Sequence, residues 1–229
     1  MLLTMIIGIT NEDVELALSS SPWDLGNAVL YNLCKEHPIH ESDEAIIAKI
    51  WLIGRTYAAA IERRRNAQEQ MTSDDFYITT VAKTIRESKI DKWLTDIPAI
   101  ITNSWIQLES AIATHKKLMD LFAEISGLEK RALASKYLHF HRPDVFFIYD
   151  SRARQAINKV TPSIIQIPEI KCKVSDAEYL FLVRKCLWLE DDIAKRYGVV
   201  LTPRQIDKIL LIVADRIKKS GRQRTLRMS

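Results

Sequence analysis

The chain has 229 residues, of which 47% are hydrophobic and 27% are charged, and it contains only 6 glycines and 7 prolines. This length suits one large domain or two small lobes that share a core. The few glycines and prolines, with long stretches of 3.6-residue periodicity, exclude sandwiches and barrels. We therefore predict an essentially all-α fold, a multi-helix bundle that forms one domain or two lobes divided near residues 66–73.

The three cysteines argue against metal and disulfide chemistry. Cys34, Cys172 and Cys186 are far apart and form no C-x-x-C pair, so neither a structural zinc site nor an iron–sulfur loop is supported. We expect no metal, no cofactor and a location in the reducing cytoplasm. The apolar start, residues 1–9, lacks a basic flank and is too short to span a bilayer, so we expect a buried segment and no membrane association.

The net charge of +4 comes from the C-terminal end. Residues 216–229 contain six basic residues and no acidic one, which leaves 27 basic and 29 acidic residues in the remainder. Because Lys and Arg drive binding to phosphates, any affinity for nucleic acid must come from a local patch or from this tail. We predict a flexible tail that is either simply solvated or binds nucleic acid through its cations, including Lys218, Lys219, Arg222 and Arg224.

Capping residues and periodicity predict six helices before residue 126, over 11–18, 22–34, 42–65, 74–88, 89–95 and 103–125. The predicted N-caps of the first three are Thr10 or Asn11, Ser21 and Ser42. The third helix has an apolar stripe that must face a core, formed by Ile46, Ile50, Ile53, Tyr57 and Ile61. Trp51 lies beside this stripe and is expected to pack against the protein.

Capping boxes also predict the last two helices. Ser175 to Glu178 opens a helix that runs to Tyr197 and ends at Gly198. Thr202 to Gln205, with a proline at the first helical position, opens the final helix, which runs to about residue 219. These boxes set helix boundaries and carry no information about function.

Residues 126–157 are the stretch whose residue types indicate a site. Gly127 ends one helical pattern, and another begins at once with small residues that permit close helix packing, namely Ala132, Ala134 and Ser135. This pattern predicts a tight helical hairpin. The second helix stops before Pro143, an apolar run over 145–148 enters the core, and Asp150 stands at the N-cap of the next helix, over 151–159.

This order of features resembles the helix-hairpin-helix DNA glycosylase superfamily, which includes endonuclease III and the oxidised-guanine glycosylases, and in particular a bacterial branch with an oxoguanine-glycosylase-like fold. In that family a lysine begins the second hairpin helix, an apolar segment follows, and a catalytic aspartate opens the next helix. The resemblance covers residues 126–157 and implies that Asp150 is the catalytic aspartate. It assigns the lysine position to Lys130, or to Arg131 if the hairpin is aligned on Gly127. The family hairpin holds a DNA phosphate on the N–H groups of two glycines, and Glu129 replaces the second one here.

The candidate catalytic residues are Asp150 and Lys130. A helix N-terminus keeps a carboxylate ionised, which suits a group that stabilises a cationic sugar or deprotonates a nucleophile, although aspartate is also simply a favoured N-cap. The helix dipole contributes ~0.3–1 kcal/mol at Lys130, less than the 1.36 kcal/mol of one pKa unit, so a nucleophilic amine would also need burial. Lys136, further along the helix, is a third candidate for the nucleophile.

Other side chains of this stretch are expected to line a pocket mouth that stacks on and hydrogen-bonds a flipped base. They are Lys136, Tyr137, His139, His141, Arg142, Tyr149 and Arg152. The i,i+2 spacing of His139 and His141 places them on different helix faces, which argues against a metal pair. His141 alternatively caps the end of its helix.

Two functions remain open at this stage. The first is a DNA glycosylase-like enzyme that extrudes a damaged or modified base and hydrolyses its N-glycosidic bond with Asp150, with or without an attacking lysine. The second is a catalytically inactive helical module that binds nucleic acid or a protein partner, for which Glu129 in the hairpin is the main support. The sequence does not distinguish DNA from RNA or identify the base.

Overall fold

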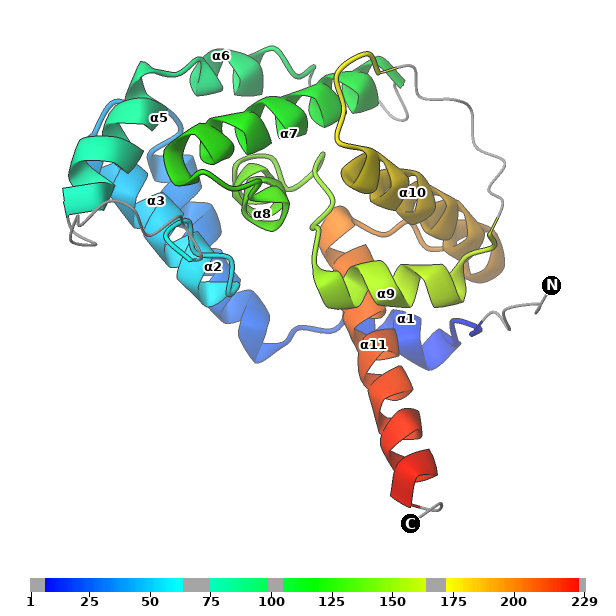
Figure 1. Ribbon diagram of the computed structural model, residues 1–229. Coiled ribbons are helices and arrows are strands. Elements are labelled where there is room, and N and C mark those ends of the chain that lie inside the picture. The colour runs from blue at the N-terminus through cyan, green and yellow to red at the C-terminus, as the bar shows by residue number, and fades with distance from the viewer. Residues whose placement is uncertain (1–6, 64–74, 99–104, 164–171, 227–229) are drawn as a thin grey trace. The chain divides into compact units, whose positions relative to one another are not determined.

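The computed structural model describes residues 7–63, 75–98, 105–163 and 172–226, and every regular element in these ranges is a helix (Figure 1). The chain divides into two compact units. We call Met1–Ser20, Phe147–Glu169 and Glu178–Ser229 the terminal unit, and Ser21–Phe146 with Ile170–Ala177 the central unit. The all-α prediction is confirmed, whereas the predicted boundary at residues 66–73 lies outside the described ranges.

The central unit is built around one buried helix, α8 (Arg131–His141). Its neighbours are α2 (Pro22–Glu36), α3 (Asp43–Thr56) and α7 (Trp105–Ser126), all of which contact α8. Three short helices complete the unit, namely η1 (Phe76–Ala82, a π-helix), α5 (Lys83–Glu87) and α6 (Ile90–Thr95). Every residue of α8 from Leu133 to Phe140 is buried, so this helix is enclosed on all sides and its polar residues must find partners inside the protein.

Helix α3 ends nine residues earlier than the predicted end at Arg65, because of a turn that the sequence does not reveal. Ala58 has a positive φ of 52°, and the N–H groups of Ala58 and Ala59 donate to the carbonyls of Arg55 and Gly54, which is the Schellman pattern. Glycine usually occupies this left-handed position. A Cβ on Gly54 would lie 3.0 Å from the Cα of Ala60, so Gly54 permits the returning chain to approach.

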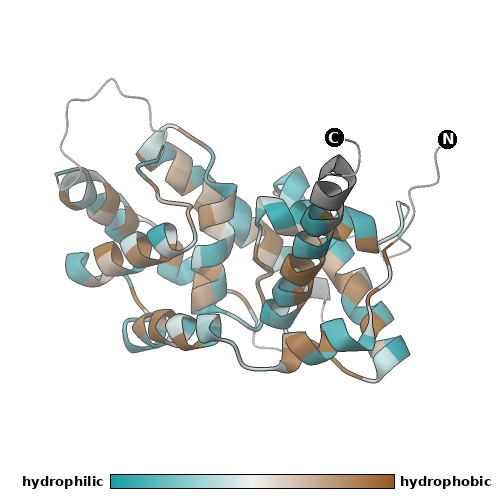
Figure 2. Ribbon diagram, turned by 90° about the horizontal axis from the view of Figure 1, so that it is seen from below, coloured by the Kyte–Doolittle hydropathy of each residue, from teal (hydrophilic) through white to brown (hydrophobic). Residues whose placement is uncertain are grey.

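The terminal unit contains α1 (Asn11–Leu18), α9 (Ser151–Val160), α10 (Ala177–Tyr197) and α11 (Pro203–Leu226). Helix α11 packs against α1 and α9. The buried face of α9 includes Ala153, Ala156 and Ile157, whose small or compact side chains permit close packing. Bands of apolar and polar residues run along the helices (Figure 2), as expected when one side of each helix is buried.

Most predicted helix starts are confirmed. Thr10 forms a capping box with Asp13, Ser42 caps α3, and Thr202 exchanges hydrogen bonds with Gln205. Gly198 follows α10 with a φ of 69°, as predicted. The prediction for the start of α10 was less accurate, because the helix begins at Ala177 and Asp176, not a cap at Ser175, directly precedes it.

Two other predictions differ from the structure. Trp51 was expected to pack, but it remains 42% exposed and its ring lies 4.9 Å from the guanidinium carbon of Arg55. The predicted flexible tail is helical up to Leu226, because α11 continues through it, and Arg216 forms an ion pair with Asp13 of α1. Within the described ranges, no helix is both long enough and apolar enough to cross a bilayer.

Candidate functional site

The hairpin between α7 and α8 has the tight turn that the sequence predicts. Gly127 adopts a φ of 70°, and its N–H donates to the carbonyl of Ala123 at 2.8 Å. The hydroxyl of Ser126 donates to the carbonyl of Phe122 at 2.7 Å. Across the turn, Nε2 of His115 in α7 lies 3.3 Å from the carbonyl oxygen of Arg131, which ties the two helices together.

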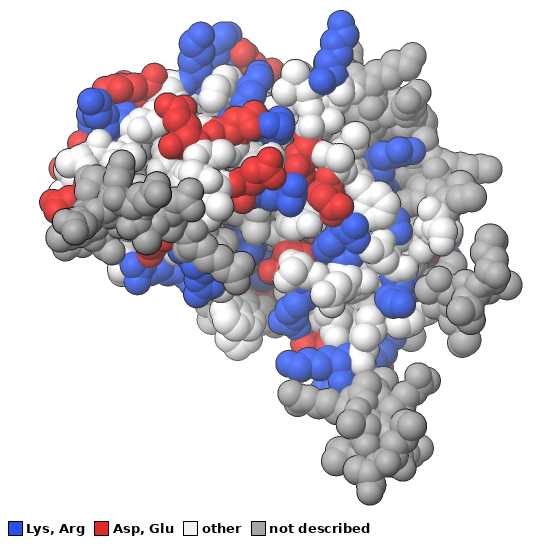
Figure 3. Space-filling view, in the orientation of Figure 1, with Lys and Arg blue, Asp and Glu red and all other residues white. Residues whose placement is uncertain are grey.

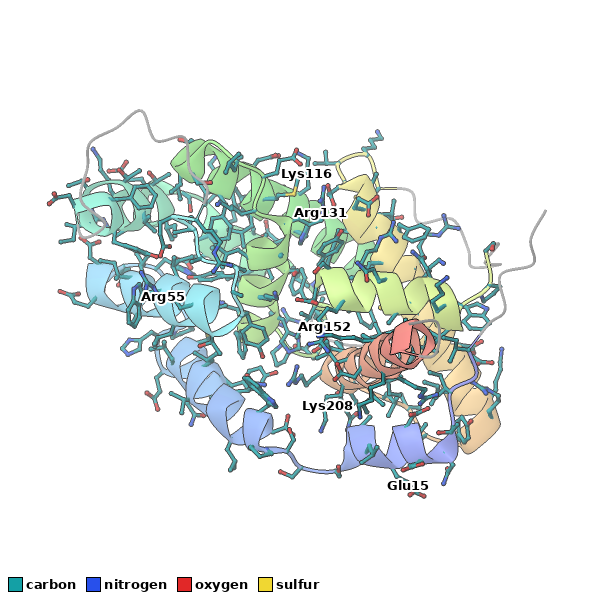
Figure 4. All side chains as sticks on the ribbon, turned by 60° about the horizontal axis from the view of Figure 1, so that its bottom comes forward. Glu15, Arg55, Lys116, Arg131, Arg152 and Lys208 are labelled. Carbon is teal, nitrogen blue, oxygen red and sulfur yellow. The ribbon has the colours of Figure 1, made fainter. Side chains whose placement is uncertain are left out.

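The cations near this turn all contact groups of the protein. Nζ of Lys130 donates to the carbonyl of Arg63 at 2.5 Å. Arg131, labelled in Figure 4, makes two parallel hydrogen bonds to the largely buried carboxylate of Asp176, at 2.5 and 2.7 Å. Nζ of the buried Lys136 donates to the carbonyl of Tyr57 at 3.2 Å. Each of the three candidate cations is therefore held in place as a hydrogen-bond donor.

Asp150 lies where the sequence predicts it. The connector before it is buried, with Phe146 fully inaccessible and Val145 7% exposed. Asp150 has extended backbone angles and caps α9, with its Oδ1 accepting from the N–H of Arg152 at 2.9 Å. The residue is half-buried. The partial positive charge of the helix N-terminus stabilises the ionised carboxylate at this position.

Two further candidate residues flank Asp150. Tyr149 is half-buried, and Arg152 is exposed at the first turn of α9 (Figure 4). The guanidinium of Arg152 pairs with Asp215 of α11 at 2.7 Å, and both side chains are more than half exposed. Such an exposed pair contributes little stability, ~0.2–1 kcal/mol, so Arg152 can exchange this partner for another anion at small cost.

The expectation that Tyr137 and His139 line a pocket mouth is wrong. Both side chains are fully buried, because α8 is enclosed on all sides. Nδ1 of His139 donates to the carbonyl of Phe146 at 2.8 Å, and its Nε2 accepts from the hydroxyl of Tyr31 at 2.7 Å. Lys136 is equally inaccessible, at 2% exposure. These three residues stabilise the interior and do not contact solvent.

Instead, Tyr137 belongs to a chain of hydrogen bonds that the sequence did not reveal. Its hydroxyl lies 2.7 Å from Nε2 of the buried His40, and Nδ1 of His40 lies 2.5 Å from Oδ1 of Asp91. Burial and the nearby charge of Lys49 lower the pKa of His40 to about 4. The ring is therefore neutral at pH 7, donating from Nδ1 to Asp91 and accepting at Nε2 from Tyr137.

Lys49 and His141 lie next to these hydrogen-bonded residues. Lys49 is fully buried, and its Nζ donates to the carbonyls of His37 and Ile39, at 2.9 and 3.4 Å, and to Nε2 of His141 at 3.5 Å. Burial lowers the pKa of Lys49 to about 8. Nδ1 of His141 donates to the carbonyl of Tyr137, so the predicted role of His141 at the end of its helix is confirmed.

A cavity of about 210 Å³ adjoins this group of polar residues in the central unit. Its walls combine apolar side chains with a few polar ones, namely Cys34, Pro38, Ile39, Asp91, Leu94, Thr95, His141 and Arg142. Burial raises the pKa of Cys34 to about 12, so this residue lines the cavity as a thiol. Of the predicted pocket residues, only His141 and Arg142 line this cavity.

One signal in the sequence could have indicated this region. Lys49 lies three residues after Ile46 and four before Ile53, within the apolar stripe of α3, so the helix places its amine in the core. A buried lysine requires several acceptors nearby. The identities of those acceptors depend on the tertiary structure and have no sequence signature.

The predicted nucleic-acid residues of the last helix are described in part. Lys218 and Lys219 are exposed on α11, whereas the side chains of Arg222 and Arg224 lie outside the described part of the structure. On the face shown in Figure 3, acidic and basic side chains are interspersed over much of the surface, and several basic ones lie over α9 and α11. In the described ranges no group of three or more His, Cys, Asp or Glu residues is arranged to hold a metal ion.

Comparison with known protein families, with curated proteins and with solved structures finds no match to this chain.

Proposed function

We propose that this chain is a DNA glycosylase-like hydrolase that releases a damaged or modified base, with Asp150 as its catalytic carboxylate. The observation that carries the proposal is the position of Asp150, a helix N-cap that follows a buried connector after a tight helical hairpin. This combination agrees with the features that residues 126–157 share with the helix-hairpin-helix glycosylases. The hairpin would contact the DNA backbone.

In the proposed reaction the bond between C1′ of the sugar and the base nitrogen breaks, and its electron pair leaves with the base. Asp150 stabilises the positive charge that develops on the sugar and accepts a proton from the water that adds to C1′. The departing base receives a proton from solvent. The base must first leave the helical stack, because its glycosidic bond is inaccessible within the duplex.

The contacts of the lysines favour water over an amine as the nucleophile. Lys130 and Lys136 both donate to main-chain carbonyl oxygens, and Arg131 stays protonated at any pH near neutrality. A Schiff base with the opened sugar requires a neutral amine. We therefore expect a monofunctional enzyme that leaves an intact abasic site.

A panel of duplexes, each with one oxidised, alkylated or deaminated base, tests this proposal. We expect free base and an alkali-labile site from at least one duplex, no covalent adduct after borohydride treatment, and base release slowed by ~10²–10⁴-fold in Asp150→Asn. Asp191→Asn is the matched control, since Asp191 is an exposed residue of the same unit paired with Lys195, and it should be fully active. An adduct that disappears in Lys130→Gln would contradict the hydrolytic mechanism, and full activity of Asp150→Asn would contradict the role of Asp150.

The second candidate function is a binding module without catalytic activity, and the hairpin supports it. Glu129 replaces a family glycine, and Arg131 is engaged by Asp176 and lies 3.6 Å from Glu129. Such a module would bind duplexes without releasing base. If the exposed Lys218 and Lys219 contact phosphates, replacing both by Gln should reduce the slope of log K against log salt by about 2, since each contact contributes ~0.9. An unchanged slope would exclude this part of α11 from binding.

A further inference from the structure

We infer that the cavity beside Asp91 is a binding site for a small ligand with a planar cationic end, a guanidinium or amidinium group whose two parallel N–H bonds point at the Asp91 carboxylate. The site lies wholly within the central unit and is independent of the reaction proposed for Asp150.

The first support is the way the carboxylate of Asp91 is held. Oδ1 lies 2.5 Å from Nδ1 of His40, and Oδ2 accepts from the main-chain N–H of the same residue at 3.0 Å. The orientation of the carboxylate is therefore fixed through both oxygens. Each carboxylate oxygen has more than one acceptor position, so both can accept a further hydrogen bond. A rigid carboxylate with one open position on each oxygen matches a donor that carries two parallel N–H bonds.

The second support is the position of this carboxylate between the interior and the cavity. The side chain of His40 is inaccessible, whereas that of Asp91 is 39% exposed and forms part of the cavity wall. The hydroxyl of Tyr137 holds the far side of the His40 ring. The hydrogen bonds from Tyr137 through His40 thus lead to the carboxylate of Asp91, which faces the cavity. Buried hydrogen bonds of this kind fix the orientation of a side chain that binds a ligand.

The remaining walls fit the body of a small planar ligand. Pro38, Ile39 and Leu94 provide apolar surface, and the imidazole of His141 stacks on that of His40 with 5.2 Å between ring centroids. A volume of about 210 Å³ is below the ~300–1,000 Å³ of sites for drug-sized ligands, so the ligand must be small.

The other charges near the cavity are partly compensated. Arg142 interacts with Asp144 at 3.3 Å and donates to the carbonyls of Ile97 and Pro98. The ammonium of Lys49 is buried and directed at two carbonyls and at His141. Asp91 is the one carboxylate among the described residues that line the cavity. A cationic group in this cavity would therefore bind to Asp91.

Calorimetric titration of the full chain with methylguanidinium and with tetramethylammonium tests the inference. The two cations carry the same charge, but the second has no N–H donor. We expect methylguanidinium to bind with a Kd of about 1 mM or lower, since ligands with few atoms bind weakly, and tetramethylammonium to bind at least tenfold more weakly. Equal affinities, or no heat from methylguanidinium at tenfold higher concentration, would overturn the proposal.

Variants separate this site from a general attraction to acidic groups. Asp91→Asn should weaken methylguanidinium binding at least tenfold, whereas Asp96→Asn should not change it, because Asp96 pairs with Lys92 and does not line the cavity. Since Asp91→Asn also perturbs the contact with His40, a second variant leaves that contact intact. Thr95→Arg places a guanidinium at the cavity wall, near the C-terminal end of α6 where a cation is favoured, and should abolish binding. Undiminished binding in either Asp91→Asn or Thr95→Arg would refute the site.

Discussion

The two carboxylates that concern function here, Asp150 and Asp91, are held by contacts of very different range. Asp150 accepts from the N–H of Arg152, two residues further along the chain. Asp91 is held by His40, 51 residues earlier, and His40 in turn contacts Tyr137, 97 residues away. The first arrangement belongs to a helix terminus and forms wherever α9 forms. The second exists only when the connection between α2 and α3, which contains His40, is packed with α6 and α8, so it should respond to any change that disturbs the interior.

The largest difference between the two regions should appear on acidification. Burial lowers the pKa of His40 to about 4 and that of His115 to about 3, against an ordinary value of 6.5. Both rings are neutral in the folded protein, and below pH 6.5 they take up protons when the chain unfolds. Their contribution to the free energy of unfolding is therefore complete above pH 6.5 and is lost as the pH falls toward 4. When the pH is lowered from 7 to 5, each of these two histidines should lower the free energy of unfolding by about 2 kcal/mol.

Urea denaturation at the two pH values measures this loss. In His40→Gln, whose side chain does not titrate, the loss between the two pH values should be smaller than in the wild type by about 2 kcal/mol. The buried His141, whose pKa is also well below its usual value because of burial, adds to the loss in the same direction. A free energy of unfolding that is the same at pH 5 and pH 7 would show that these rings are hydrated in solution.

The second largest effect concerns the interior end of the chain that supports Asp91. Tyr137→Phe removes the donor to Nε2 of His40 at a fully buried position, and should lower the free energy of unfolding by about 2 kcal/mol. Tyr31→Phe is the matched control, because Tyr31 also contacts a histidine Nε2 at 2.7 Å but is only half-buried, so water can replace its hydroxyl. We expect about 1 kcal/mol or less for the control. Equal losses would indicate that water reaches His40 as easily as His139.

At Asp150 the effect on stability should be smaller and should depend on capping alone. Asp150→Ala removes the acceptor for the Arg152 N–H and should cost about 1 kcal/mol. Asp150→Asn retains an acceptor and should leave the melting temperature within a few degrees of the wild type. Thermal unfolding followed by circular dichroism distinguishes the two variants. A large loss in Asp150→Asn would mean that the charge is needed for folding, and the residue could no longer be probed by this substitution.

The smallest effect is expected for the ion pair beside Asp150. Arg152 and Asp215 are both more than half exposed, so Asp215→Ala should change the free energy of unfolding by ~0.2–1 kcal/mol, and less at high salt. Urea denaturation at low and at 0.5 M salt measures the change. A salt-independent loss well above this range would show that the pair is more buried in solution than in the structure.

The parts of the fold that the sequence predicts are those with local causes. Thr10, Ser42 and Thr202 cap their helices through residues three positions away, and Asp150 caps α9 through a residue two positions away. The early end of α3 was not predicted because an alanine, Ala58, occupies the left-handed position after the helix, where a glycine usually marks the helix end in the sequence. The backbone there is set by the return of the chain past Gly54, which is a tertiary contact.

The same distinction applies to the candidate site. The position of Asp150 and the tight hairpin at Gly127 follow from neighbouring residues and were predicted. The burial of Tyr137 and His139 was not, because the sequence of α8 has only a few large apolar residues and does not indicate a helix enclosed on all sides. The partners of Lys130 and Arg131, the carbonyl of Arg63 and the carboxylate of Asp176, are 67 and 45 residues away and have no local signature.

The central claim, that Asp150 is the catalytic carboxylate of a base-releasing hydrolase, is tested most directly by a single-turnover measurement. The rate of base release from a saturated complex with a processed duplex is compared between the wild type and Asp150→Asn, which keeps the N-cap and removes the charge. We predict equal duplex affinity and a rate reduced by ~10²–10⁴-fold, the range that one acid–base group contributes. Base release at the wild-type rate by a folded Asp150→Asn variant would contradict the claim.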